Sequence, residues 1–261
     1  MRDIFEGVTP EMSDPDPVRR AQIQMKRPLP KRFYAEATVS PTDAGFAVTL
    51  DGRAVKTPAR NTLILPTSGA AELVAEEWRA QGEEVDPATM PVTRLTNTAI
   101  DAVSKTLEEV LEDIVRFSSS DLLCYRAEDP QELVERQSAR WNPVLAWLND
   151  THGVKLITIS GIMHQEQPAQ STSAFRRALE RYGNAFQLAA LHVVTTLTGS
   201  AALTLALADG FSSLEEVWAL AHLDEDWTNE HWGVDEEAAA RREARLREMQ
   251  AAWALFNAVQ T

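Results

Sequence analysis

The sequence contains little cysteine and little glycine, and both shortages limit what the chain can be. The single cysteine, Cys124, excludes an internal disulfide and fits a reducing compartment. Nothing beside it in LLCYRA supports a nucleophile, so we expect a packed small side chain. The 11 glycines form neither a GxGxxG nor a GxxxxGK(S/T) pattern, and we therefore expect no nucleotide chemistry.

Positive charge is also scarce. With 25 Lys and Arg against 39 Asp and Glu, the formal net charge is −14 at pH 7. Such a surface repels nucleic-acid phosphates and anionic membranes, and it favours basic or mixed protein partners. We therefore expect no nucleic-acid partner.

Little in the chain resembles a membrane or targeting segment. The longest run without Asp, Glu, Lys or Arg, residues 182–208, is interrupted by polar residues and by the Gly199–Ser200 break, so we expect two buried helices and no membrane insertion. The first 17 residues are acidic and match neither a signal nor a transit peptide. Residues 1–30 lack periodicity, and we expect an N-terminal arm that is mobile or lies on the surface.

Residues 31–90 are predicted to form a small β-rich domain with one helix. Apolar residues alternate in GFAVTL, the period of a half-buried strand, and Asp51–Gly52 tolerates the positive φ of a hairpin turn. A helix capped by Thr67 or Ser68 should run to Arg79. Short strands are expected at residues 32–40, 45–52, 53–58 and 61–66.

Residues 91–261 are predicted to form a larger, mainly α-helical domain. Apolar residues recur at helical spacing through most of this region, with a kink or break expected at Pro143 and one strand-like segment, KLITIS. The predicted fold class is therefore α+β, with a small antiparallel β-rich domain before a helical one.

The stretch from Ser213 to Gly233 contains the most informative residues. Read as one helix, it places Glu225 in the middle of an apolar face, where an unpaired charge is costly and therefore needs a basic neighbour or a function. Asp226 points away from that face, on a polar stripe with His222 and Glu230.

Two enzyme hypotheses follow from this stretch. His222, Asp226, Glu230 and nearby His231 include several metal-ligand types, but no HExxH or paired CxxC spacing occurs, and a solvated helix face explains the same residues. Glu225 with a raised pKa could act as a general acid, although no second carboxylate is placed beside it. Three other histidines, His152, His164 and His192, lie singly without a Ser or Cys partner motif. Three basic residues around the hairpin, Arg53, Lys56 and Arg60, could bind a phosphate, although a solvated strand face explains them more simply.

A protein-binding surface is the third hypothesis. Trp227 and Trp232 lie among acidic residues, and tryptophan is enriched at interface hot spots. The carboxylates would select a partner that presents Arg or Lys. Burial of both tryptophans in the core is the alternative.

Five segments resemble the ATP synthase assembly chaperones that act on the α subunit of the catalytic head. They are RFYAEATVS, GFAVTLDGRAVKTPARNTLILPT, AEEWRAQGEEVDPATMPVTRLTNTAID, DLLCYRAEDPQELVERQ and LDEDWTNEHWG. The resemblance implies an assembly factor without catalysis or cofactor, which holds the free α subunit until the β subunit replaces it. It also implies that the functional carboxylate is Glu225, with Asp224 and Asp226 as alternatives. Thr228 departs from the glutamine common in the family, and we assign it no role.

We therefore expect a bacterial, cytoplasmic chaperone, whose eukaryotic relatives would work in the mitochondrial matrix. The expected partner-binding residues are Asp224, Glu225, Asp226, Trp227, Glu230 and Trp232. The alternative function is a metal-dependent hydrolase centred on His222 and Asp226.

Overall fold

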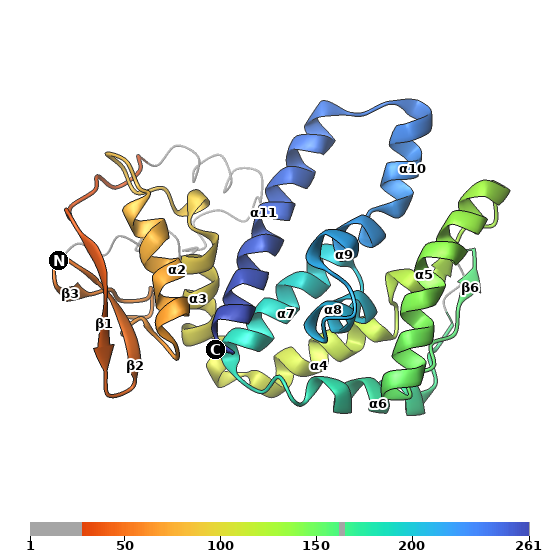
Figure 1. The fold of residues 1–261 in the computed structure, drawn as a ribbon, viewed down its shortest axis with the longest axis horizontal. Coiled ribbons are helices and arrows are strands. Elements are labelled where there is room, and N and C mark those ends of the chain that lie inside the picture. Colours follow the sequence, from red (N-terminus) through yellow and green to blue (C-terminus); the bar gives the residue numbers. More distant parts are fainter. Residues whose placement is uncertain (1–27, 162–164, 261) are drawn as a thin grey trace, which may run out of the picture. The chain divides into compact units, whose positions relative to one another are not determined.

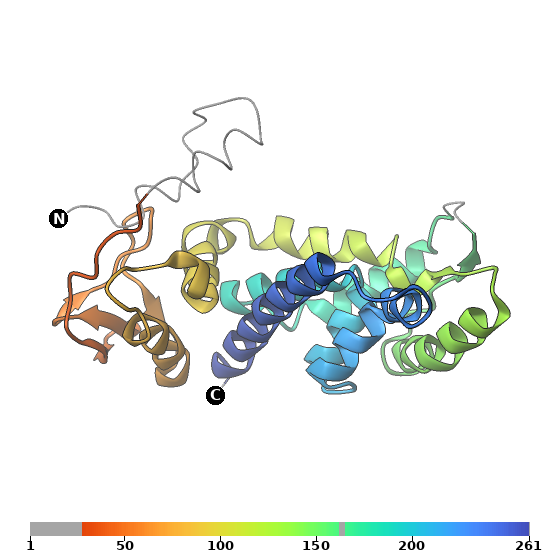
Figure 2. The same ribbon diagram turned by 90° about the horizontal axis from the view of Figure 1, so that it is seen from above.

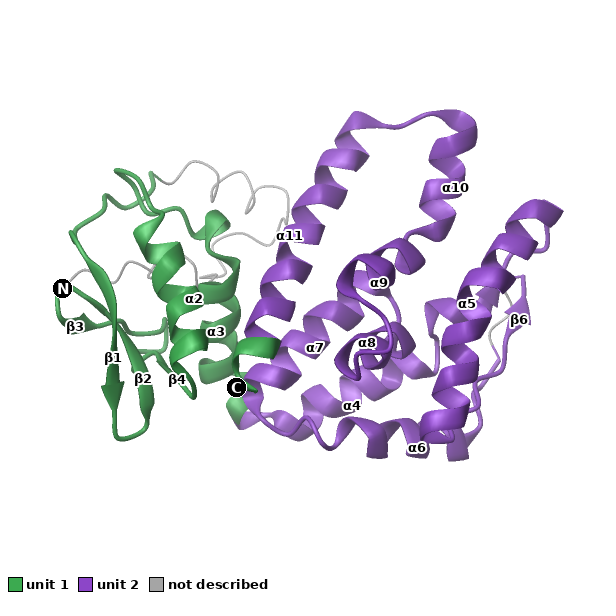
Figure 3. Ribbon diagram, in the orientation of Figure 1, with its two compact units in different colours: residues 1–104, 257–261 green, residues 105–256 purple. Residues whose placement is uncertain are grey.

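The computed structural model describes residues 28–161 and 165–260, and most of the N-terminal arm and His164 lie outside these ranges. The chain divides into two compact units, residues 1–104 with 257–261 and residues 105–256 (Figure 3). The division therefore falls after Ser104, whereas the sequence suggested a boundary between residues 90 and 91. The reason is that α3 (Pro91–Asp101) packs on α2 (Ser68–Arg79), the helix of the first unit.

The first unit contains a four-stranded antiparallel sheet (Figure 1). Its strands are β1 (Ala37–Thr42), β2 (Gly45–Leu50), β3 (Arg53–Ala54) and β4 (Ile64–Leu65). The central strand β2 pairs with all three others, and the turn after it has φ of 48° at Asp51 and 77° at Gly52, as the predicted hairpin requires. Helix α2 packs against the sheet and buries Val74 and Trp78 completely.

Helix α3 begins without a cap of its own, because its N-cap residue Met90 makes no side-chain hydrogen bond. Glu77 of α2 supplies the cap. Its carboxylate accepts hydrogen bonds from the backbone N–H groups of Val92 and Thr93, both at 2.7 Å, and from Thr93 Oγ1 at 2.6 Å. Burial raises the pKa of Glu77, although the hydrogen bonds from Thr93 and Val92 act in the opposite direction.

Replacing Glu77 by alanine is expected to lower the free energy of unfolding by about 2 kcal/mol, because it leaves the first turn of α3 with unpaired N–H donors. Urea unfolding followed by circular dichroism measures the loss. Glu76→Ala is the matched control, since Glu76 lies beside Glu77 on α2 and is exposed. Equal losses in the two variants would contradict the capping role.

The second unit is built from helices and one small parallel β-pair, β5 (Tyr125–Arg126) with β6 (Ile159–Ser160) (Figure 1; Figure 2). The helices are α4 (Leu107–Ser118), α5 (Gln131–His152), α6 (Ala169–Leu179), α7 (Ala185–Thr198), α8 (Ala201–Ala208), α9 (Leu214–Ala221), α10 (Leu223–Trp232) and α11 (Glu236–Ala258). Helix α5 runs through Pro143 without a break. The α+β fold class is confirmed.

The uncharged run at residues 182–208 forms α7 and α8, as predicted. Gly199 ends α7 with φ of 67°, a conformation that costs glycine little. Helix α8 is buried from Ala201 to Leu207 and contacts α4, α5, α7 and α9. No helix within the described residues is both long enough and apolar enough to cross a membrane.

Candidate functional site

The stretch from Ser213 to Gly233 forms two helices, not one. Helix α9 ends before His222, whose backbone has φ of −112° and ψ of 18°, and α10 begins at the next residue. Leu223 is the one buried residue of α10, and the side chain of Glu225 is 39% exposed, so Glu225 is not buried on an apolar face.

His222 does not lie on a polar stripe with Asp226 and Glu230, because it is buried. Its Nδ1 lies 2.8 Å from the carbonyl oxygen of Trp218, and its ring packs on that indole at a centroid distance of 3.9 Å. Burial lowers the pKa of His222 and favours the neutral imidazole. Within the described ranges, no three His, Cys, Asp or Glu side chains are grouped so as to hold a metal ion.

Polar side chains of α5 hold one side of α10. Gln137 donates from Nε2 to Asp224 Oδ1 at 2.8 Å, and the guanidinium of Arg136 binds both oxygens of Glu230, at 2.7 and 2.8 Å. The hydrogen bonds from Arg136 lower the pKa of Glu230. Arg136 also lies 5.6 Å above the ring of Trp227.

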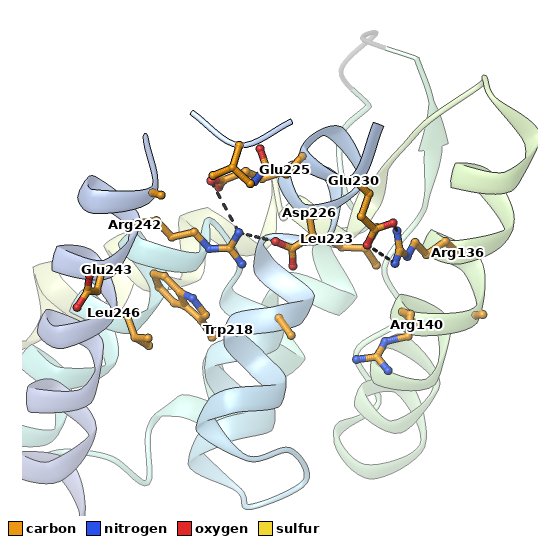
Figure 4. Close-up of a pocket in the computed structure, with 15 residues that line it drawn as sticks. Arg136, Arg140, Trp218, Leu223, Glu225, Asp226, Glu230, Arg242, Glu243 and Leu246 are labelled. Atoms are coloured by element: carbon orange, nitrogen blue, oxygen red, sulfur yellow. Dashed lines mark hydrogen bonds and ion pairs between the residues drawn. The ribbon is translucent and has the colours of Figure 1, made fainter. Parts of the chain in front are cut away.

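Arg242 of α11 holds the other side of α10 (Figure 4). Its guanidinium donates a hydrogen bond to Asp226, and the same nitrogen lies 3.8 Å from Glu225 Oε1. The side chains of Glu225 and Asp226 are both 39% exposed. Glu225 is therefore neither a free surface group nor a buried structural ion pair.

The two tryptophans of α10 differ in exposure. Trp227 is half-buried, and its ring stacks on His231 at a centroid distance of 4.1 Å. Trp232 is 77% exposed at the end of the helix, beside Val234, which is 65% exposed. The alternative that both tryptophans belong to the core is wrong for Trp232.

A groove of about 1000 Å³ lies beside α10, within the second unit (Figure 4). It has apolar surface from Trp218, Leu223 and Leu246, and charged side chains from three helices. These charged residues are Arg136 and Arg140 of α5, Glu225, Asp226 and Glu230 of α10, and Arg242 and Glu243 of α11.

The groove brings together three of the six predicted partner-binding residues, Glu225, Asp226 and Glu230. The sequence did not indicate its arginines. Arg136 precedes its partner Glu230 by 94 residues, and nothing in the local pattern of either helix relates the two. Long-range pairs of this kind depend on how the helices pack, so single-sequence periodicity contains no signal for them.

The other residues singled out from the sequence are buried, paired with a carboxylate, or exposed in the first unit. Cys124 is buried, which raises the pKa of its thiol to about 12 and makes it unreactive, as expected for a packed side chain. His152 and His192 bind Asp209 and Asp113, at 2.7 and 2.8 Å. Three basic residues of the hairpin region are exposed in the first unit; they are Arg53, Lys56 and Arg60.

An apolar groove with charged walls, on a helix that ends in an exposed tryptophan, is typical of a protein that binds other proteins. Comparison with known proteins identifies the class further. The sequence model of the ATP12 chaperone protein family matches residues 31–149. Protein atp12, mitochondrial, of Schizosaccharomyces pombe is 27% identical over 231 residues, which cover 84% of this chain and 79% of that protein.

Two crystal structures are similar along almost their entire length. The Atu1473 protein of Agrobacterium tumefaciens, described as a putative chaperone, is 52% identical, with a TM-score of 0.88 and coverage of 98% of this chain and 95% of the other. Atp12 of Paracoccus denitrificans is 34% identical, with a TM-score of 0.83 and coverage of 88% and 98%. The chain belongs to the ATP12 chaperone family, and the resemblance to ATP synthase assembly chaperones is confirmed.

Proposed function

We propose that this chaperone binds the unassembled α subunit of the ATP synthase catalytic head, without using ATP, and prevents its aggregation until the β subunit replaces it. The observation that carries the proposal is the groove beside α10, together with the exposed Trp232 at the end of that helix, in a member of a chaperone family. We also propose that the protein is bacterial and works in the cytoplasm.

The chemistry of the site fits such a client. A free subunit exposes apolar and charged surface that its assembly partner later covers, and such surface promotes aggregation. A chaperone that covers it must also be displaced, which favours an interface combining a few apolar anchors with replaceable polar contacts. Trp232 and Val234 offer exposed anchors, while the carboxylates of α10 offer contacts for basic residues.

The direct test mixes the purified chaperone with the purified α subunit. Light scattering measures suppression of aggregation at 37 °C, and size-exclusion chromatography with light-scattering detection measures the complex. We expect suppression that saturates as chaperone is added, and a complex that forms without nucleotide. A chaperone that neither suppresses scattering nor co-elutes with the α subunit would refute the proposal.

Glu225→Ala is expected to weaken binding of the α subunit by about fivefold or more, while changing the free energy of unfolding by less than about 0.5 kcal/mol. The reason is that Glu225 is 39% exposed and lies 3.8 Å from its arginine, so its contribution to the chaperone's own stability is small. Isothermal titration calorimetry and urea unfolding measure the two effects.

Glu216→Ala is the matched control for Glu225→Ala. Glu216 is an exposed glutamate of the preceding helix, α9, and does not line the groove. Unchanged affinity in Glu225→Ala, with the complex fully preserved, would show that another carboxylate of α10 makes the contact.

A further inference from the structure

Arg242 lines the groove and lies against two carboxylates of α10. It extends from α11 toward α10, its side chain is 21% exposed, and its guanidinium lies between Glu225 and Asp226 (Figure 4). One guanidinium thus lies within ion-pair distance of two carboxylates from the same turn of α10. Asp226 receives a hydrogen bond, whereas Glu225, at 3.8 Å, is left incompletely paired.

Another cation can replace Arg242 in its contacts with Glu225 and Asp226 at a small cost in folding free energy. Ion pairs between partly exposed side chains contribute little net stability, because each charge regains water when the pair opens. Helix α10 has a single buried residue, Leu223, and it ends at a glycine with φ of 91°. Polar contacts therefore hold much of this helix, and a new cation can replace an old one without disrupting a core.

Apolar surface lies beside these carboxylates. Trp218 and Leu246 line the same groove, from α9 and α11, and Leu246 lies one helical turn beyond Arg242. An apolar side chain in the groove would therefore reach Trp218 and Leu246 while a cationic neighbour reaches Glu225. The net charge of −14 attracts a cationic segment from a distance.

We propose that the groove receives a segment of the client in which an apolar side chain packs against Trp218 and Leu246, and an adjacent Lys or Arg binds Glu225 and Asp226 in place of Arg242. The inference rests on the proposed function, since the client is the unassembled α subunit. Arg242 is then an internal competitor of the client. It holds the carboxylates of α10 in the empty chaperone and releases them on binding.

Internal competition predicts an increase in affinity when Arg242 loses its charge. Arg242→Gln keeps the aliphatic stem and a hydrogen-bond donor but removes the guanidinium, so we expect the α subunit to bind about two- to fivefold more tightly. If Arg242 instead contacted the client or only supported the groove, the same change would weaken binding. The sign of the effect therefore separates the two roles.

The experiment titrates purified α subunit into the full-length chaperone by isothermal titration calorimetry, at low and at physiological salt. Arg241→Gln is the matched control, because Arg241 lies on the same helix, carries the same charge and pairs with Glu237, and neither residue lines the groove. A gain that also occurs in Arg241→Gln would be a general charge effect and would overturn the proposal. Leu246→Ala is expected to weaken binding about tenfold through loss of the apolar contact.

A double-mutant cycle tests whether the tighter binding of Arg242→Gln depends on the carboxylates of Glu225 and Asp226. In the presence of Glu225→Gln and Asp226→Asn, Arg242→Gln should no longer tighten binding, because the carboxylates for which Arg242 competes are gone. Unchanged or weaker binding by Arg242→Gln, with circular dichroism showing a folded protein, would overturn the inference while leaving the proposed function intact. Failure of the wild-type chaperone to bind the α subunit would refute the proposed function itself.

Discussion

Replacing Trp232 by alanine is expected to weaken binding of the α subunit roughly 10- to 100-fold and to leave the chaperone's unfolding temperature unchanged. A tryptophan that is 77% exposed contributes little to the stability of its own fold. The same side chain gains most when a partner covers it, because it buries a large apolar area and keeps one polar group for hydrogen bonding. Large loss of binding with little loss of stability is the pattern of an interface anchor.

Isothermal titration calorimetry and thermal unfolding measure the two effects of Trp232→Ala. Phe33→Ala serves as the control, since Phe33 is an exposed aromatic residue, 58% accessible, in the other compact unit. If Trp232→Ala bound the α subunit as tightly as the wild type, the anchor would have to lie elsewhere.

Replacing Asp121 by alanine is expected to lower the free energy of unfolding by about 3 kcal/mol at pH 7. Asp121 is fully buried at the start of the short helix Leu122–Cys124 and ties this segment to the beginning of α8. Its carboxylate accepts hydrogen bonds from Leu123 N at 3.0 Å, Ser200 Oγ at 2.7 Å and Ala202 N at 2.8 Å. Removing the acceptor leaves buried donors unpaired, and each costs about 1–3 kcal/mol.

The pH dependence of this variant follows from the pKa of Asp121, which burial raises from 3.8 to about 6. Between these values the folded state binds more protons than the unfolded state. The additional stability that this group contributes through its raised pKa is therefore complete below about pH 4 and is lost as the pH rises through about 6, whereas the hydrogen bonds that its carboxylate accepts persist at pH 7. The wild type should exceed Asp121→Ala by a larger margin at pH 5 than at pH 7.

Urea unfolding of both proteins at pH 5 and pH 7 measures these margins. Asp150→Ala is the control, because Asp150 is exposed near the end of α5 and should change stability little at either pH. A margin that grows toward pH 7 would show that Asp121 is stabilised in its ionised form, contrary to the effect of its burial.

Local patterns in the sequence predicted most of the secondary structure correctly. The turn at Asp51–Gly52, the cap at Thr67, and the division of residues 182–208 at Gly199 all depend on conformational preferences of a few adjacent residues. The strands are shorter than predicted, because pairing in a sheet ends where partner strands end. Glu77 shows what local patterns miss, since the helix that it caps lies beyond the end of its own.

The candidate site was predicted only in part, because local patterns do not show how helices pack. The sequence places carboxylates and tryptophans together between residues 224 and 232, but it could not show the break at His222. That break arises where a buried ring packs on Trp218. Read as one continuous helix, the stretch placed Glu225 in the middle of an apolar face, whereas its side chain is 39% exposed.

The sequence by itself determined the fold class, the family and the acidic, tryptophan-bearing segment, because each depends on residues that are neighbours along the chain. Only the tertiary structure decided that Trp232 is exposed, that Glu225 is half-exposed, and that Arg136 and Arg242 hold α10 from two sides. Exposure and ion pairing depend on which surfaces the packed helices leave open. Those surfaces are set by contacts between segments distant in sequence, such as α5 and α10.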